Sequence, residues 1–169
     1  SDAYYIEQQA RAELIALGLT ECVHYSMGSV ADATRQTGYD EADLVAIANP
    51  LSAEFQILRP SVQTHLLQAV AHNVAHGNHD LRLFELGRVY CAAEGTAEER
   101  RQAGVVLTGK VYPEQYGEDG KRIADFFDLK GIIEDWLAAR RVVNVSVVAH
   151  EHPAFTNGAC AAVKRGEKV

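Results

Sequence analysis

The stretch that most constrains this chain is residues 78–94, because it has the character of a strand inside a sheet. Its apolar residues first alternate with polar ones and then become nearly continuous: Leu81, Leu83, Phe84, Leu86, Val89 and Tyr90. That pattern is typical of a strand that is covered on much of both faces. The stretch ends with Cys91 and Ala93, and neither side chain offers a positive group that could hold an anion. The sequence therefore predicts a sheet around a long strand whose end lacks a charged catalytic group.

Residues 4–17 predict an amphipathic helix, and Gly18 marks its end. One face repeats apolar residues at spacings of four, four and three: Ile6, Ala10, Leu14 and Leu17. A stripe of this kind packs either against the sheet of its own chain or against another subunit. The sequence alone leaves both interpretations open.

Two further helices are predicted by the same periodicity. One follows the break at Pro60, with Ser61 as its candidate cap, and ends at Gly77. The other opens at Asp125, where an acidic side chain suits the positive end of a helix. Its expected buried face consists of Phe127, Ile132, Ile133, Trp136 and Leu137.

Short apolar runs between turn residues predict several strands. They lie at 20–27, 44–48, 55–58, 103–108, 145–149 and 159–163. Residues 95–102 are expected to form a charged turn, so that 103–108 pairs antiparallel with the long strand, and 110–121 is expected to be a mobile loop. This succession favours an α+β fold with an antiparallel sheet over a doubly wound parallel fold, which would alternate strands and helices more regularly.

The charge balance limits what the chain could hold by itself. Its formal net charge is −7, which argues against a surface built to grip phosphate backbones. Its three cysteines lie far apart without a Cys-x-x-Cys pair, which indicates reduced thiols in a cytoplasmic protein. No apolar run approaches the roughly 20 residues that cross a bilayer, so we expect no membrane contact. We expect one domain over residues 4–169, truncated at its C-terminal end, with residues 1–3 as a cloning remnant.

His72 and His76 are the strongest candidates for metal ligands, because residues four apart on a helix lie on one face. Asn73 stands where the metalloprotease motif has a glutamate, and no nearby carboxylate is an obvious third ligand. The sequence contains neither a glycine-rich phosphate loop nor a G-x-S-x-G nucleophile elbow.

Five segments together carry a more specific pattern. They are Leu17-Gly18-Leu19-Thr20-Glu21, Asn49-Pro50-Leu51-Ser52, Leu58-Arg59-Pro60-Ser61, Leu81-Arg82-Leu83-Phe84-Glu85-Leu86-Gly87-Arg88-Val89-Tyr90 and Asp125-Phe126-Phe127-Asp128-Leu129-Lys130-Gly131. In this order they resemble the synthetase-core-like module of the bacterial phenylalanyl-tRNA synthetase β subunit, over nearly the whole chain from Tyr4 onward.

The resemblance implies a class II aminoacyl-tRNA synthetase-like fold, an antiparallel sheet flanked by helices. Residues 4–27 would then match the first class signature, which serves subunit association, and residues 81–108 would match the second. In active members the second signature places an arginine, and two residues later an acidic residue, at the positions that here hold Cys91 and Ala93.

The chemistry explains why this change matters. Forming an aminoacyl adenylate brings a carboxylate to the α-phosphate of ATP, and arginine stabilises the charge with a permanently charged planar fork of donors. Cys91 is a weak, neutral donor. Arg88 is not a convincing replacement, because it precedes the aromatic end of the strand, and we expect it to pair with Glu85.

We therefore expect a non-catalytic module that holds the catalytic α subunit in an α2β2 assembly. The resemblance implies that ATP and magnesium act at the α subunit, that tRNA(Phe) is bound through the full complex, and that this fragment binds no cofactor itself. The helix stripe is expected to contribute to the subunit contact: Ile6, Ala10, Leu14 and Leu17. Two other functions stay open, an active adenylate-forming enzyme with rearranged anion donors and a zinc-dependent hydrolase that uses His72 and His76.

Overall fold

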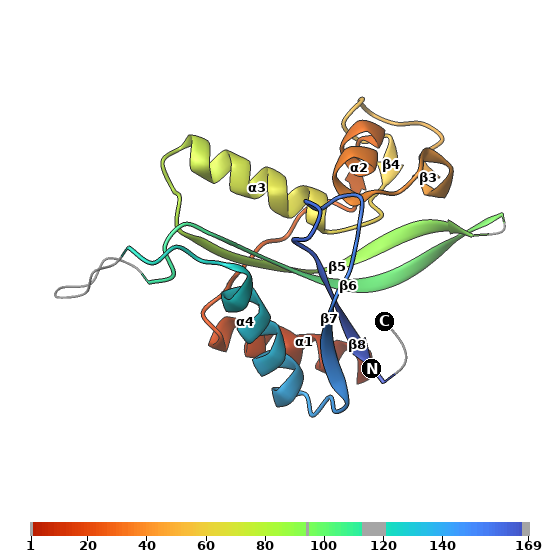
Figure 1. The fold of residues 1–169 in the computed structure, drawn as a ribbon. Helices are drawn as coiled ribbons and strands as arrows, with labels where there is room; N and C mark the ends of the chain where they lie inside the picture. Colours follow the sequence, from red (N-terminus) through yellow and green to blue (C-terminus); the bar gives the residue numbers. More distant parts are fainter. Residues whose placement is uncertain (1, 94, 113–120, 167–169) are drawn as a thin grey trace.

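The computed structural model describes residues 2–93, 95–112 and 121–166. A long antiparallel ribbon runs through its centre, formed by β5 (Leu81–Ala93) and β6 (Thr96–Thr108). The short strand β1 (Thr20–Glu21) pairs parallel with β5, which gives the strand order β1-β5-β6. Helices lie on both faces of the ribbon (Figure 1). The predicted α+β fold around a long strand at 78–94 is therefore confirmed.

Helix α3 (Gln63–Ala75) covers one face of the ribbon. The core on this face consists of Val62, Leu66, Leu83 and Val89. Its close packing depends on Gly104 of β6, because a Cβ there would lie 2.6 Å from Cγ2 of Val62 and 2.7 Å from Cδ1 of Leu66. The second predicted helix is confirmed, with Ser61 just before it accepting a hydrogen bond from the N–H of Gln63.

Helices α1 (Asp2–Ala16) and α4 (Phe126–Ala139) lie together on the opposite face (Figure 1). The core on this face consists of Leu14, Leu19, Phe84 and Ile132. Because side chains alternate along a strand, the continuous apolar run of β5 supplies both cores. Helix α4 begins with a capping box, in which the side chains of Asp125 and Asp128 each accept a hydrogen bond from the other's backbone N–H. Both predicted helices are confirmed.

A second, smaller sheet joins β2 (Met27–Gly28), β4 (Ile57–Leu58) and β3 (Val45–Ala46) in the order β2-β4-β3. Helix α2 (Val30–Thr37) and the 3-10 turn η1 (Glu41–Asp43) complete this unit. It has a core of its own: Ala33, Leu44 and Ile57. The unit contacts β5 through η1 and β3, so it lies beside the end of the strand that carries Cys91.

Two strands follow α4 and pair with each other. They are β7 (Val145–Ala149) and β8 (Ala161–Arg165), and their antiparallel pairing forms a separate two-stranded sheet. The strand predicted at 145–149 is confirmed, and the one predicted at 159–163 begins and ends two residues later.

The charged turn predicted at 95–102 is wrong, because β6 already begins at Thr96 and pairs with β5 along its whole length. The outer half of the ribbon is solvated, so charged side chains can stand on the strand without a cost of burial. Arg88 of β5 binds Glu99 of β6 across the ribbon at 3.0 Å. Cross-strand pairs of this kind stabilise the solvated part of the ribbon.

The single strand predicted at 20–27 is also wrong, because the chain leaves β5 after Cys22 and pairs again only at Met27. Val23 is 84% exposed, so the apolar alternation in this segment does not reflect a buried face. The expected burial of Phe127 is wrong as well, since its ring is exposed in the first turn of α4 and the buried stripe starts at Ile132.

Residues 113–120 of the predicted loop at 110–121 lie outside the described residues. On either side of them, Lys110 and Ile123 form an isolated antiparallel bridge. In the part of the chain that the structure describes, no helix combines the length and the apolar character needed to cross a bilayer.

Candidate functional site

The end of β5 places Cys91 beside a tyrosine. Cys91 and Tyr39 are both half-buried, and Tyr39 also packs against the core of the smaller sheet. Burial, and then hydrogen bonding to Cys91, raises the pKa of the Tyr39 phenol above its ordinary value. The phenol is therefore neutral at physiological pH, and the space beside Cys91 holds an uncharged ring.

Arg100 also lies near Cys91, but a carboxylate of its own strand holds it. Its Nε donates to Oε1 of Glu98 at 2.8 Å, and Glu98 stands directly opposite Cys91 in the ribbon. This hydrogen-bonded ion pair raises the pKa of Arg100 and lowers that of Glu98. Both side chains are exposed, so this is a surface ion pair and not a fixed cation buried beside Cys91. Ala93 lies opposite Thr96 and brings no acid to the site.

A buried ion pair lies farther along β5, on the α3 face. Glu85 is 2% exposed, and its Oε1 accepts a hydrogen bond from Nη1 of Arg59 at 2.7 Å. Its Oε2 lies 2.7 Å from Nδ1 of His24. The pairing expected between Glu85 and Arg88 is therefore wrong, because residues three apart on a strand point to opposite faces. In the sequence, the burial of Arg59 is indicated only weakly, by its position between the apolar residues Leu58 and Pro60.

His24 stacks on His65 of α3, with ring centroids 5.5 Å apart. Burial, and then the nearby charge of Arg59, lowers the pKa of His65 below its ordinary value. The Nδ1 atom of His65 is buried and has no hydrogen-bond partner among the described residues. His65 is therefore a neutral imidazole that extends the charged cluster toward the surface.

A cavity of about 440 Å³ opens between α1, α4 and the middle of the ribbon formed by β5 and β6. Four arginines line it: Arg59, Arg88, Arg101 and Arg140. Two carboxylates, Glu7 and Glu85, are also in its lining, so basic groups are in excess. Ile6, Val23 and Trp136 add apolar surface. The cavity therefore combines exposed basic groups with exposed apolar side chains.

The members of the α1 stripe that was predicted to form a subunit contact differ in how far they are exposed. Leu14 is 1% exposed and packs against Phe84, and Ala10 is also buried. Leu17 is half-buried against the same core. Ile6 is 52% exposed, so it is the member of the stripe that a partner could reach directly.

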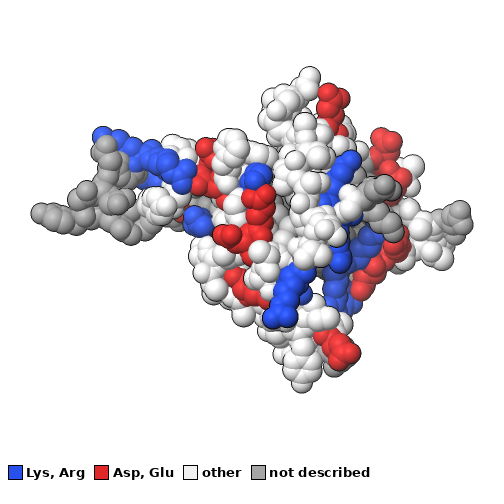
Figure 2. All heavy atoms as spheres, turned by 60° about the horizontal axis from the view of Figure 1, so that its bottom comes forward, with Lys and Arg blue, Asp and Glu red and all other residues white. Residues whose placement is uncertain are grey.

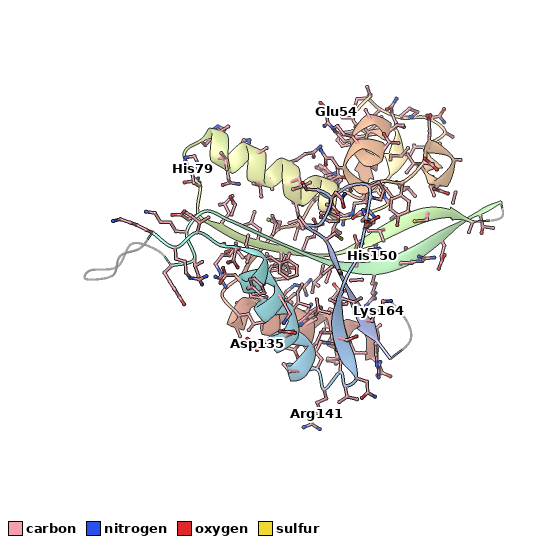
Figure 3. All side chains as sticks on the ribbon, in the orientation of Figure 1. Glu54, His79, Asp135, Arg141, His150 and Lys164 are labelled. Carbon is pink, nitrogen blue, oxygen red and sulfur yellow. The ribbon has the colours of Figure 1, made fainter. Side chains whose placement is uncertain are left out.

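The histidine set does not form a metal site among the described residues. His72 and His76 have ring centroids 4.3 Å apart, but Nδ1 of His76 is hydrogen-bonded to the backbone oxygen of His72. No group of three or more potential ligands occurs in the described ranges. His79 lies past the end of α3 and His150 past the end of β7, well apart (Figure 3).

A family profile and individual relatives both place this chain in the same family. A family profile described as the phenylalanyl tRNA synthetase beta chain CLM domain matches residues 1–169. The phenylalanine–tRNA ligase beta subunit of Protochlamydia amoebophila is 35% identical over 136 residues, which cover 79% of this chain and 17% of the relative. That of Thiobacillus denitrificans is 32% identical over 153 residues, covering 90% and 18%. The chain thus spans less than a fifth of these relatives.

Solved structures with the same fold are class II synthetases. The Desulfitobacterium hafniense pyrrolysyl tRNA synthetase PylSc superposes with a TM-score of 0.72 over 98% of this chain and 54% of its own, at 14% identity. An ATP phosphoribosyltransferase regulatory subunit/histidyl-tRNA synthetase from Bacillus halodurans has a TM-score of 0.64 over 86% and 35%, at 17% identity. These likenesses confirm the predicted class II fold.

Proposed function

Because the chain belongs to the phenylalanyl-tRNA synthetase beta chain CLM domain family, we propose that it is a synthetase-like module without catalytic activity of its own, which supports assembly with a catalytic partner subunit. The partner is the α subunit of an α2β2 ligase, which activates phenylalanine and charges tRNA(Phe). The curated relatives are named as beta subunits, which supports a multisubunit protein.

The observation that carries the proposal is the pairing of Cys91 with Tyr39. Adenylate formation needs fixed positive charge at the α-phosphate. Here a thiol and a neutral phenol occupy the end of β5, and the nearby Arg100 is an exposed side chain in a surface ion pair with Glu98. Among the described residues, this end of β5 therefore lacks the buried, fixed cation that a nucleotide phosphate would need. ATP and magnesium would act at the α subunit.

The surface around the start of α1 supports the assembly role. Tyr4, Tyr5 and Ile6 are exposed on the first turns of this helix, and Val23 is exposed beside the same cavity as Ile6. Exposed apolar groups gathered in one area commonly mark a protein–protein interface. Buried members of the stripe such as Leu14 would support that surface from within.

The proposal is tested with the full-length chain and its α subunit, purified separately and then mixed. We expect phenylalanine-dependent ATP–pyrophosphate exchange only from preparations that contain α, and a co-purifying complex of both chains. In that complex Cys91→Ala should leave the exchange rate within about twofold, because no donor to the reacting phosphate is lost.

Two results would contradict the proposal. Exchange by the full-length chain without α would show that it carries its own active site. A fall of about a hundredfold in the Cys91→Ala complex, as typical for a lost transition-state donor, would place Cys91 in the catalytic machinery.

A further inference from the structure

The cavity between α1, α4 and β5 is lined by two arginines in opposite positions, an arrangement that is unfavourable by itself. Arg88 of β5 and Arg101 of β6 stand directly opposite each other in the ribbon. Like charges in directly opposite positions destabilise a strand pair. Both arginines line the cavity, and both are exposed at its margin. An anion placed between them would turn this unfavourable pair into a binding site.

Backbone geometry brings these two side chains close together. The backbone oxygen of Phe84 accepts a hydrogen bond from the N–H of Cys22, and the N–H of Tyr90 donates to the backbone oxygen of Arg59. Neither partner belongs to β6, so the even-numbered residues of β5 direct their backbone groups away from β6. Arg88 is therefore in a non-hydrogen-bonded pair with Arg101, the type in which opposite side chains approach most closely.

The carboxylates that now hold the two arginines are exchangeable. Arg88 binds Glu99 at 3.0 Å and Arg101 lies 3.3 Å from Glu7, and all four side chains are between 37% and 56% exposed. Exposed ion pairs of this kind contribute little free energy, so a better-placed acid can replace them. Arg140 is held more firmly, since its Nη1 donates to the half-buried Glu13 at 3.0 Å.

An apolar margin surrounds the basic groups. Ile6 and Val23 stand exposed at the mouth, and Trp136 is half-buried in the wall. Figure 2 brings the α1–α4 side forward and shows Lys and Arg side chains grouped on part of this face, with Asp and Glu between them. Such a surface suits a ligand that carries both a negative charge and apolar groups beside it.

We propose that this cavity receives an acidic side chain of the α subunit, flanked by apolar residues, between Arg88 and Arg101. The inference rests on the proposed assembly function and names the chemistry of the contact. A nucleic acid is disfavoured as the occupant, because a chain with a net charge of −7 is not built to hold a phosphate backbone. A protein acid with apolar neighbours matches both parts of the surface.

The test uses the full-length chain and its α subunit. The double variant Arg88→Gln/Arg101→Gln should weaken binding of α by roughly tenfold, because two charges that meet the acid are lost. It should also make the dissociation constant less sensitive to salt. The matched control is Arg35→Gln/Arg122→Gln, which removes the same charge from two exposed arginines that lie in other ion pairs. The control should stay within about twofold of the wild type.

A second double variant, Arg88→Lys/Arg101→Lys, keeps the charge and should retain most of the salt sensitivity while binding less tightly than arginine. It keeps the proposal testable if the glutamine variant does not fold. Thermal unfolding of each chain serves as the check on folding, and the glutamine variant should melt no lower than the wild type, because a like-charge pair is relieved.

The outcomes separate this inference from the function on which it rests. If the wild-type chain does not bind α, the assembly function fails. If wild type binds and the glutamine variant binds as tightly, with the same salt dependence, the acid-binding cavity fails while assembly stands. If the glutamine variant binds α normally but the complex loses affinity for tRNA, the occupant is a phosphate and the proposal is overturned.

Discussion

Glu85 has almost no contact with water: its Oε1 accepts hydrogen bonds from Arg59 and from the backbone N–H of His24, and its Oε2 lies beside Nδ1 of His24. Arg59 and His24 come from separate segments of the chain, so the carboxylate ties the start of α3 and the segment after β1 to the central strand. Arg59 also donates from Nε to the backbone oxygen of Arg88 at 3.0 Å. Buried charges are tolerated when they are paired and hydrogen-bonded in this way.

Glu85→Gln should therefore destabilise the fold strongly. Removing one member of a buried ion pair leaves an uncompensated charge, here Arg59, at a cost of about 3–5 kcal/mol. Urea unfolding of the two proteins measures the difference. The matched control is Glu99→Gln, which breaks the exposed pair with Arg88 and should cost no more than about 1 kcal/mol. Equal losses in both variants would show that the Glu85 pair contributes no more than a surface contact.

His65 predicts a pH dependence of stability. Burial lowers the pKa of His65 in the folded state below the 6.5 of an ordinary histidine. As the pH falls, the imidazole is therefore protonated in the unfolded chain before it is protonated in the folded one. The contribution of His65 to the free energy of unfolding is complete above the ordinary histidine pKa and is lost as the pH falls below it. The free energy of unfolding should decrease between about pH 7.5 and about pH 5.5, and less so in His65→Gln.

The control for this experiment is His72→Gln, which removes an exposed imidazole from the same helix. It separates the loss of a buried imidazole from the loss of any imidazole. Arg59 and His24 stand near His65 and lower its pKa further, whereas Glu85 raises it. If His65→Gln unfolds with the same pH profile as the wild type, His65 does not contribute to the acid side of the stability curve.

At the scale of elements, α3 packs closely on the face of the ribbon that carries Cys91. Val62 and Leu66 approach the backbone of β6 at Gly104, where a larger residue would meet both side chains. Gly87 of β5 is similarly close to Arg59 and Val62. Two glycines on adjacent strands thus let the aliphatic side chains and the buried arginine lie directly on the sheet.

Gly104→Ala should lower the free energy of unfolding by about 1–3 kcal/mol, since the added Cβ overpacks the contact with α3. The matched control is Gly131→Ala in α4, where a Cβ would meet nothing within 4 Å. There alanine should stabilise the protein by about 0.5–1 kcal/mol through its helix propensity. Denaturant unfolding measures both changes. Two changes of the same sign would contradict the packing argument.

At the scale of the whole molecule, α1 has two roles that its sequence does not separate. Its inner residues hold the core under β5, and its first turns present exposed side chains beside the basic cavity. A negative charge at Leu14 would therefore test folding, because this residue is buried within its own chain. A charge at Ile6 tests the surface itself.

Ile6→Asp should weaken co-purification with the α subunit by about tenfold or more, since a charge would be placed in an apolar contact. Thermal unfolding of the free chain should change little. The control is Leu51→Asp, because Leu51 is 91% exposed and belongs to the smaller unit rather than to α1. Equal binding by the Ile6 and Leu51 variants would place the α contact elsewhere on the chain.

Much of this fold could be predicted because its signals are local. Apolar spacing along α1 and the acidic start of α4 identified both helices, and the continuous apolar run of β5 identified a strand buried on two sides. The neutral character of Cys91 and Ala93 is likewise a property of the residues themselves. These local signals did not predict the solvated half of β6. A run of charged residues is typical of a turn, and it is identified as a strand only when its cross-strand partners are known.

By itself the sequence determined the order of α1, α3 and α4, the central strand and the absence of a fixed cation at the end of that strand, whereas α2 was not predicted. The tertiary structure alone decided which charges meet. Glu85 lies 26 residues from Arg59 and 61 from His24 in the chain, and Arg88 faces Arg101 only through the register of the ribbon. Local patterns follow from backbone periodicity, which neighbouring residues encode, whereas an ion pair or a cavity depends on distances that exist only after distant segments have packed.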